Sequence, residues 1–125
     1  MKKSFSTFIL LAFVSIGMYA QQRQISYIKS DGAWYHVYDE SGKKVNTMSK
    51  QAVGKVVGWS SDFFVAVDGE WVKTYEITGK KINTMSKQSV GEVIGVSGNT
   101  FTTQDGEWIK VYDKTGKKIS TRSAH

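Results

Sequence analysis

The sequence predicts an all-β fold made of about 2.75 tandem copies of a four-stranded antiparallel meander. Three observations lead to this fold class. The sequence repeats every 37 residues, turn dipeptides separate short runs of β-branched and aromatic residues, and no segment after residue 20 shows sustained helical periodicity. Each copy contains an Asp-Gly pair, then a tryptophan, then a Gly-Lys-Lys run. The tryptophans are Trp34, Trp71 and Trp108, and the repeats span about 24–60, 61–97 and 98–125.

The first segment of the chain, residues 1–20, is predicted to be a secretory signal peptide. Lys2 and Lys3 form a basic start, residues 8–17 are almost entirely apolar, and Ala20 is a small residue before the expected cleavage bond. This apolar stretch is shorter than the roughly 20 residues of a membrane-spanning helix. We therefore expect one exported domain over residues 21–125, periplasmic or secreted from a Gram-negative cell, with no membrane span in the mature chain.

Composition narrows the classes of partner. The chain has no cysteine, which excludes both disulfides and the cysteine-linked lipid of a lipoprotein. Without Lys2 and Lys3, 15 basic residues stand against 11 acidic ones, a net charge of +4. An exported chain with this modest excess and no dense basic patch is not expected to bind nucleic acid.

The first repeat is expected to begin one strand late. Residues 24–30 align with the strand predicted at 63–67, so that Tyr27 is the counterpart of Phe64. The strand that is missing, ahead of residue 24, would be equivalent to residues 90–97. The whole domain should hold eleven strands rather than twelve.

The second repeat shows the complete unit. Its Asp-Gly pair is the strongest short signal for a hairpin, and the residues around it are favoured on a pleated surface. A Thr-Gly turn and a polar connection at 86–88 separate the later strands. The expected strands are 63–67, 71–76, 81–85 and 90–97, and the third repeat ends with a strand at 117–122.

The strand faces indicate how the units are arranged. In the second repeat Trp71 and Tyr75 point to one face while Val72 and Thr74 point to the other, so both faces carry large or β-branched side chains. A sheet with one wet face would alternate apolar and polar residues. We therefore expect sheets covered on both sides, as in propeller-like blades that pack face to face. A β-trefoil, also three repeats of four strands, is the alternative.

Part of the sequence resembles a known type of blade. The runs 93–101 and 108–113, followed by Thr115-Gly116-Lys117, resemble one blade of NHL-type β-propellers, and the Trp…Tyr-Asp-x-x-Gly core is similar to WG-type repeats. A period of 37 residues is short for a blade, and fewer than three blades cannot close a ring. The resemblance therefore implies unpaired edges that associate with another chain, either in a dimer with six blades or by donation of the missing strand.

The repeated tryptophans are the first candidates for a binding site. Trp34, Trp71 and Trp108 are expected to pack between neighbouring sheets, because buried tryptophans contribute large apolar areas. Alternatively, one aromatic ring per repeat stacks on sugars in a multivalent lectin. The lysine pairs after each turn glycine are interpreted as solvated turns, or alternatively as contacts to anionic glycans or lipid headgroups.

Departures from the repeat give two further candidates. His36 stands where the other copies have Lys73 and Lys110. Trp59 stands where the next copy has Val96, so it is interpreted either as an exposed contact or as a core position that tolerates a larger ring.

The sequence does not predict an enzyme, a cofactor or a metal site. Only two histidines, His36 and His125, are available as a catalytic base or a ligand, and the carboxylates recur singly along the repeats. We therefore expect an exported, non-catalytic binding or assembly module that acts through protein–protein contacts. Its partner would be a second copy or another envelope or extracellular protein. The alternative is a lectin-like protein that binds glycans through the repeated aromatics.

Overall fold

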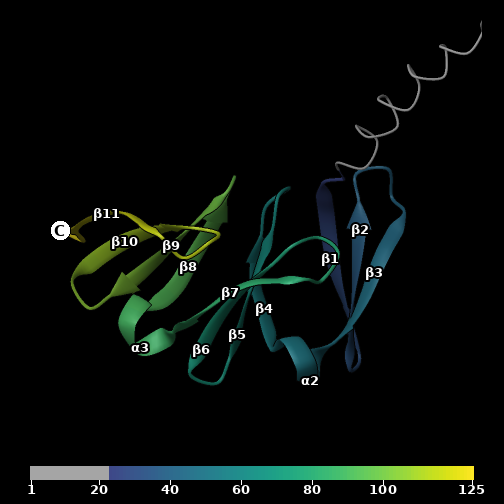
Figure 1. Ribbon diagram of the computed structural model, residues 1–125, viewed down its shortest axis with the longest axis horizontal. Helices are drawn as coiled ribbons and strands as arrows, with labels where there is room; N and C mark the ends of the chain where they lie inside the picture. Colours follow the sequence, from purple (N-terminus) through teal and green to yellow (C-terminus); the bar gives the residue numbers. More distant parts are fainter. Residues whose placement is uncertain (1–22) are drawn as a thin grey trace, which may run out of the picture.

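The computed structural model describes residues 23–125, and the predicted signal peptide at 1–20 lies outside the described residues. The described chain forms three antiparallel sheets in sequence order, with three, four and four strands (Figure 1). The eleven strands, three in the first sheet and four in each of the others, confirm the predicted all-β meander. The sheets follow one another along the chain, each with its own uninterrupted strand order, rather than forming a trefoil.

The first sheet contains β1 (Ile25–Asp31), β2 (Trp34–Asp39) and β3 (Lys44–Ser49). The second sheet contains β4 (Lys55–Trp59), β5 (Phe64–Asp68), β6 (Trp71–Tyr75) and β7 (Lys81–Ser86). The third sheet contains β8 (Glu92–Ser97), β9 (Thr100–Asp105), β10 (Trp108–Asp113) and β11 (Lys118–Ser123). Every pair of consecutive strands within a sheet is antiparallel, and the Asp-Gly turns join β1 to β2, β5 to β6 and β9 to β10.

The connections between sheets differ from the prediction, because each contains a single turn of helix. These turns are α2 (Lys50–Val53) and α3 (Lys87–Val90), which lie along one edge of the fan of sheets (Figure 1). Each ends at a glycine of positive φ, 93° at Gly54 and 98° at Gly91. A four-residue turn is too short to produce the periodicity by which helices are recognised.

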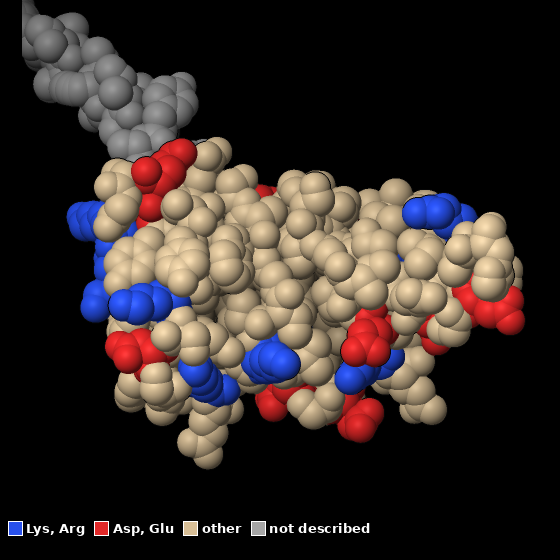
Figure 2. Space-filling view, turned by 180° about the vertical axis from the view of Figure 1, so that it is seen from behind, with Lys and Arg blue, Asp and Glu red and all other residues tan. Residues whose placement is uncertain are grey.

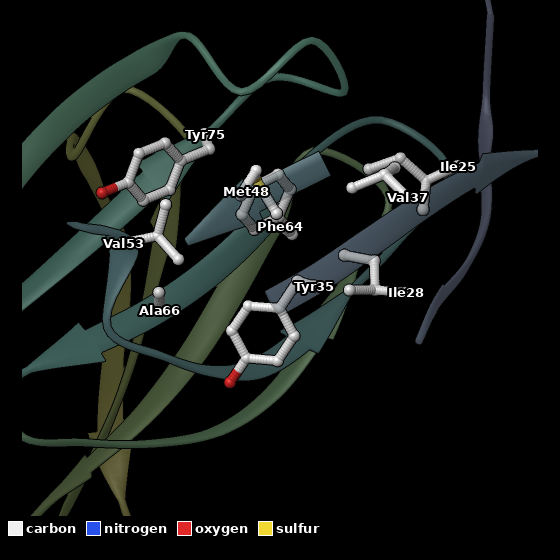
Figure 3. Close-up of a cluster of buried hydrophobic side chains, with 9 residues drawn as sticks. All are labelled: Ile25, Ile28, Tyr35, Val37, Met48, Val53, Phe64, Ala66 and Tyr75. Atoms are coloured by element: carbon white, nitrogen blue, oxygen red, sulfur yellow. The ribbon is translucent and has the colours of Figure 1, made fainter. Parts of the chain in front are cut away.

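Two apolar cores hold the three sheets together, one at each junction. In β5, Phe64 and Ala66 point toward the first sheet and belong to the first core (Figure 3), while Val65 points to the second core. The first core contains Ile25, Ile28, Tyr35, Val37, Met48, Val53, Phe64, Ala66 and Tyr75. The second core contains Phe63, Val65, Val72, Val90, Phe101 and Tyr112.

Both junctions use the same aromatic pair. The Phe64 and Tyr75 rings stack with centroids 5.1 Å apart, and their counterparts Phe101 and Tyr112 stack at 5.5 Å. Offset stacking of this kind adds to the apolar burial of the two rings. The two junctions are therefore copies of one packing arrangement.

Only the middle sheet is covered on both faces by the described chain. The prediction that every sheet is covered on both sides is therefore wrong for the first and third sheets. Within residues 23–125, no helix is long and apolar enough to span a membrane.

Candidate functional site

The outer side of the first sheet, which we call the first face, carries an aromatic pair at the surface. Tyr27 on β1 is the cross-strand partner of Tyr38 on β2. These residues are the counterparts of Phe64 and Tyr75, which are buried in the first core. Tyr27 is about half exposed, at 50 %. The first face is defined by Tyr27, Lys29, Trp34, His36, Tyr38 and the adjoining turn residue Glu40.

The outer side of the third sheet, the last face, carries aliphatic residues at positions that are buried elsewhere. Ile109 is the counterpart of Val72, and Ile119 is the counterpart of Ile82. Val72 is fully buried and Ile82 packs against the second core, whereas Ile119 is 56 % exposed. The last face is defined by Thr102, Gln104, Ile109, Val111, Ile119, Ser120 and Arg122.

Polar residues replace part of the apolar set on the last face. Gln104 is the counterpart of Val67, and Arg122 is the counterpart of Met48 and Met85. Terminal units of repeat proteins need polar substitutions of this kind to stay in solution. The remaining aliphatic positions make the last face a mixed surface, which is typical of non-obligate protein interfaces.

The structure explains His36 as a variant of an ion pair present in every repeat. Its Nε2 atom lies 3.1 Å from an Asp31 oxygen, and its Nδ1 atom lies 3.2 Å from the Thr47 hydroxyl. In the other sheets a lysine amine donates to the equivalent aspartate at 2.8 Å. The hydrogen bond to Asp68 raises the pKa of Lys73. His36 therefore preserves a pairing that the repeat already contains.

The repeated tryptophans lie differently from the prediction, because about half of each side chain is exposed. The exposed fractions are 49 % for Trp34, 50 % for Trp71 and 51 % for Trp108. Each tryptophan is the first residue of its strand, directly after the hairpin turn, and is exposed there. Their position beside the turn was the available signal that they would not be central packing residues.

Trp59, by contrast, is partly buried against the first core. Its ring contacts Tyr27 edge-to-face, with centroids 5.8 Å apart. Its counterpart Val96 packs closely against β4 of the preceding sheet, because a Cβ on Gly58 would lie 2.7 Å from a methyl carbon of Val96. The first sheet has no strand equivalent to β4. The larger ring of Trp59 therefore occupies space that the missing strand leaves, which favours the core interpretation over the exposed contact.

The lysine pairs are exposed, as the sequence interpretation expected, with the first lysine of each pair in the turn and the second at the start of β3, β7 or β11. Figure 2 shows Lys and Arg side chains interspersed with Asp and Glu rather than gathered in one basic patch on this side of the molecule. Asp39 organises the first of these turns: its Oδ1 accepts from the Ser41 hydroxyl at 2.6 Å and from the Lys43 amide at 3.0 Å. These hydrogen bonds lower the pKa of Asp39, and Asp113 with Thr115 repeats the arrangement.

Neither of the two faces was identified by sequence reasoning. The signal was present in the alignment of the repeats, because Tyr38, Ile109 and Ile119 keep the apolar or aromatic character of counterparts that are buried or partly buried. Among residues 23–125, no cluster of three His, Cys, Asp or Glu side chains is arranged to hold a metal ion. Comparison with protein-family models and with curated proteins finds no match to this chain.

Proposed function

We propose that this protein is an exported, non-catalytic binding or assembly module that acts through protein–protein contacts at its first and last faces. One observation carries the proposal: both faces display side chains at positions that form the cores of the internal junctions. Ile119 and Tyr27 are at least half exposed although their counterparts pack in those cores. Exposed residues of this kind, rimmed by polar groups, typically mark interaction surfaces.

The wider architecture supports the same function. Three consecutive antiparallel sheets, each joined through its last strand to the first strand of the next, support the resemblance to NHL-type propeller blades and to WG-type repeats. His36 stands where the other repeats have a lysine paired with an aspartate, and its hydrogen bond to Asp31 supports a structural role for this residue. The predicted leader would deliver the module to the periplasm or beyond, and the mass of the protein recovered from the cell envelope or medium tests its removal after Ala20.

Site-specific photo-crosslinking in cells tests the proposed function. A photoreactive residue at Ile119 or Tyr38 is expected to yield covalent adducts with protein, identified by mass spectrometry. Ile94 is the matched control, because it lies in the same sheet as Ile119, is equally exposed at 56 %, and its counterpart Val57 belongs to neither core. Adducts from Ile94 alone, or none from the two faces, would contradict the proposal.

A second function, glycan binding, is favoured by the equal exposure of the three repeated tryptophans. One half-exposed aromatic ring per sheet suits weak, repeated stacking on sugar rings. Adding envelope or host glycans should then shift the tryptophan fluorescence, and the shift should persist in Trp59→Phe but disappear when Trp34, Trp71 and Trp108 are replaced together. An unchanged emission spectrum in the wild type excludes this function for the glycans used.

A further inference from the structure

We infer that the partner of the two faces is a second copy of this chain, docked head to tail. The last face of each copy covers the first face of the other, and the two copies together close a ring of six sheets. This inference rests on the proposed function, since it names the partner of the same surfaces. It specifies which residues meet, which the proposed function does not.

The internal junctions supply the template for this contact. In each junction one sheet contributes aliphatic residues from strand β2 or β6 and its neighbours. The next sheet contributes its stacked Phe–Tyr pair, on which those residues pack. Val72 and Ile82 meet Phe101 and Tyr112 in this way. The last face repeats the aliphatic half of the junction, with Ile109, Val111 and Ile119, and the first face repeats the aromatic half, with Tyr27 and Tyr38. One copy therefore displays both halves of a junction at opposite ends.

The polar exchanges on the two faces are complementary in charge. In the internal junctions the methionine of one sheet lies beside the turn glycine of the next, because the Met48 sulfur is 3.7 Å from the position of a Cβ on Gly79. On the last face Arg122 takes the methionine position, and on the first face the equivalent turn glycine is Gly42. Glu40 lies two residues before Gly42.

The position of Glu40 belongs to the junction in both internal cases. Its counterpart Ile77 packs against the first core, and its counterpart Lys114 pairs with Asp62 of the preceding sheet at 2.8 Å. Glu40 and Arg122 are both exposed in the single chain. Head-to-tail docking brings these opposite charges together. At the equivalent place the internal junctions have the apolar contact of Ile77 or the ion pair of Lys114 with Asp62.

The unoccupied turn on the first face fits the same arrangement. A Cβ on Gly79 or Gly116 would overlap Asn46 or Asn83 of the preceding sheet, whereas a Cβ on Gly42 would meet nothing within 4 Å. Gly42 has nevertheless the same backbone conformation, with φ of 86° against 92° at Gly79. The turn on the first face therefore has the same backbone conformation as the turns that pack against a preceding sheet in the internal junctions.

The number of sheets favours a pair of copies. Propellers typically contain four to eight blades, and six is the one multiple of three in that range. Each copy contributes three sheets, with one face of each kind at its ends. A head-to-tail contact that closes on itself gives a ring with two identical junctions, and a closed ring uses both faces of both copies.

Charge reversal tests the inference directly. The protein, purified with its leader removed by the producing cell, should have the mass of two copies in light scattering over a wide range of concentrations. Arg122→Glu and Glu40→Arg should each weaken the pair by about tenfold or more, because like charges then meet in both junctions. The double variant should restore the pair. An equimolar mixture of the two single variants should also restore it, because each junction then joins opposite charges.

Apolar variants provide the matched control. Ile119→Glu should weaken the pair by at least about tenfold, whereas Ile94→Glu, with the same substitution at the same exposure, should leave it intact. The inference would be overturned if the wild-type protein had the mass of one copy at every concentration, or if it formed oligomers of increasing size. It would also be overturned if mixing the two charge variants did not restore the pair. Adducts from Ile119 to a different protein, together with a single-copy mass, would retain the proposed function and reject a second copy as the partner.

Discussion

The burial of individual aromatic residues differs sharply within the middle sheet, and their mutational effects should differ accordingly. Phe64 is fully buried and stacks on Tyr75, while Trp71 is 50 % exposed at the start of β6. Phe64→Ala should lower the free energy of unfolding by about 3–5 kcal/mol, because it removes a large ring from a packed core. Trp71→Ala should cost only about 1 kcal/mol, since half of its surface is already in water.

Chemical denaturation of the two variants measures this difference. Comparable losses of unfolding free energy would show that Trp71 is a packing residue after all, as the sequence first indicated. The residue type and the repeat suggested burial, but burial depends on how far neighbouring sheets overlap, and a single repeat unit does not encode that extent.

The turn aspartates should make the fold sensitive to acid. Ser41 and Lys43 hold the pKa of Asp39 below its ordinary value of 3.8, and Thr115 and Lys117 do the same for Asp113. The unfolded chain therefore binds more protons than the folded chain as the pH falls below 3.8. The stability contributed by these carboxylates is present above that pH and is lost as the pH falls through the lower, folded-state pKa.

Replacing both aspartates should flatten this acid dependence. Asp39→Asn with Asp113→Asn should lose less unfolding free energy than the wild type between neutral pH and the acid region, although it begins from a lower value. Glu76→Gln is the matched control in the second sheet, where the backbone forms the same turn, with Gly79 N–H donating to the Glu76 carbonyl, but the described residues show no hydrogen bond from the turn amides to the Glu76 carboxylate. An equal effect of the control variant would show that general charge, rather than the turn bonds, causes the acid sensitivity.

At the scale of elements, the strands follow from the sequence and the links between sheets do not. Runs of aromatic and β-branched residues and the Asp-Gly turns predicted β5 and β6 nearly to the residue. The helical turns α2 and α3 were expected only as polar connections, because four residues show no periodicity. Each helical turn ends at a glycine. A side chain there would collide with the backbone of a neighbouring strand that is distant in sequence.

Gly54 is the clearest example of that requirement, and its substitution should be costly. Its φ is 93°, and a Cβ would lie 2.7 Å from the carbonyl oxygen of Val67 in β5. Gly54→Ala should therefore lower the thermal midpoint far more than Gly32→Ala, where φ is 59° and no atom lies within 4 Å of the added Cβ. The Gly32 variant should cost about 1–2 kcal/mol, the usual penalty of a left-handed alanine. Equal shifts in the two melting curves would rule out close packing at Gly54.

For the whole molecule, the repeat period predicted three units, eleven strands and the incomplete first unit. It did not predict which surfaces stay open, because Tyr38 and Ile119 have the same character as their buried counterparts. A repeat describes a unit with neighbours on both sides. Apart from the missing strand, the terminal sheets differ from the repeat only at substituted positions such as Glu40 and Arg122. The role of these residues can be inferred only from the way their counterparts pack in the other repeats.

The double coverage of the middle sheet has a consequence for the order in which the molecule opens. β5 contributes Phe64 to one core and Val65 to the other. If one end sheet detaches, the middle sheet therefore stays packed against the other end sheet. In a single copy, such as the Arg122→Glu variant, amide hydrogens in β5 should exchange with deuterium more slowly than those in β1 or β11, since exchange in β5 requires both junctions to be lost. Uniform exchange rates across the three sheets would instead show that the chain opens in a single step.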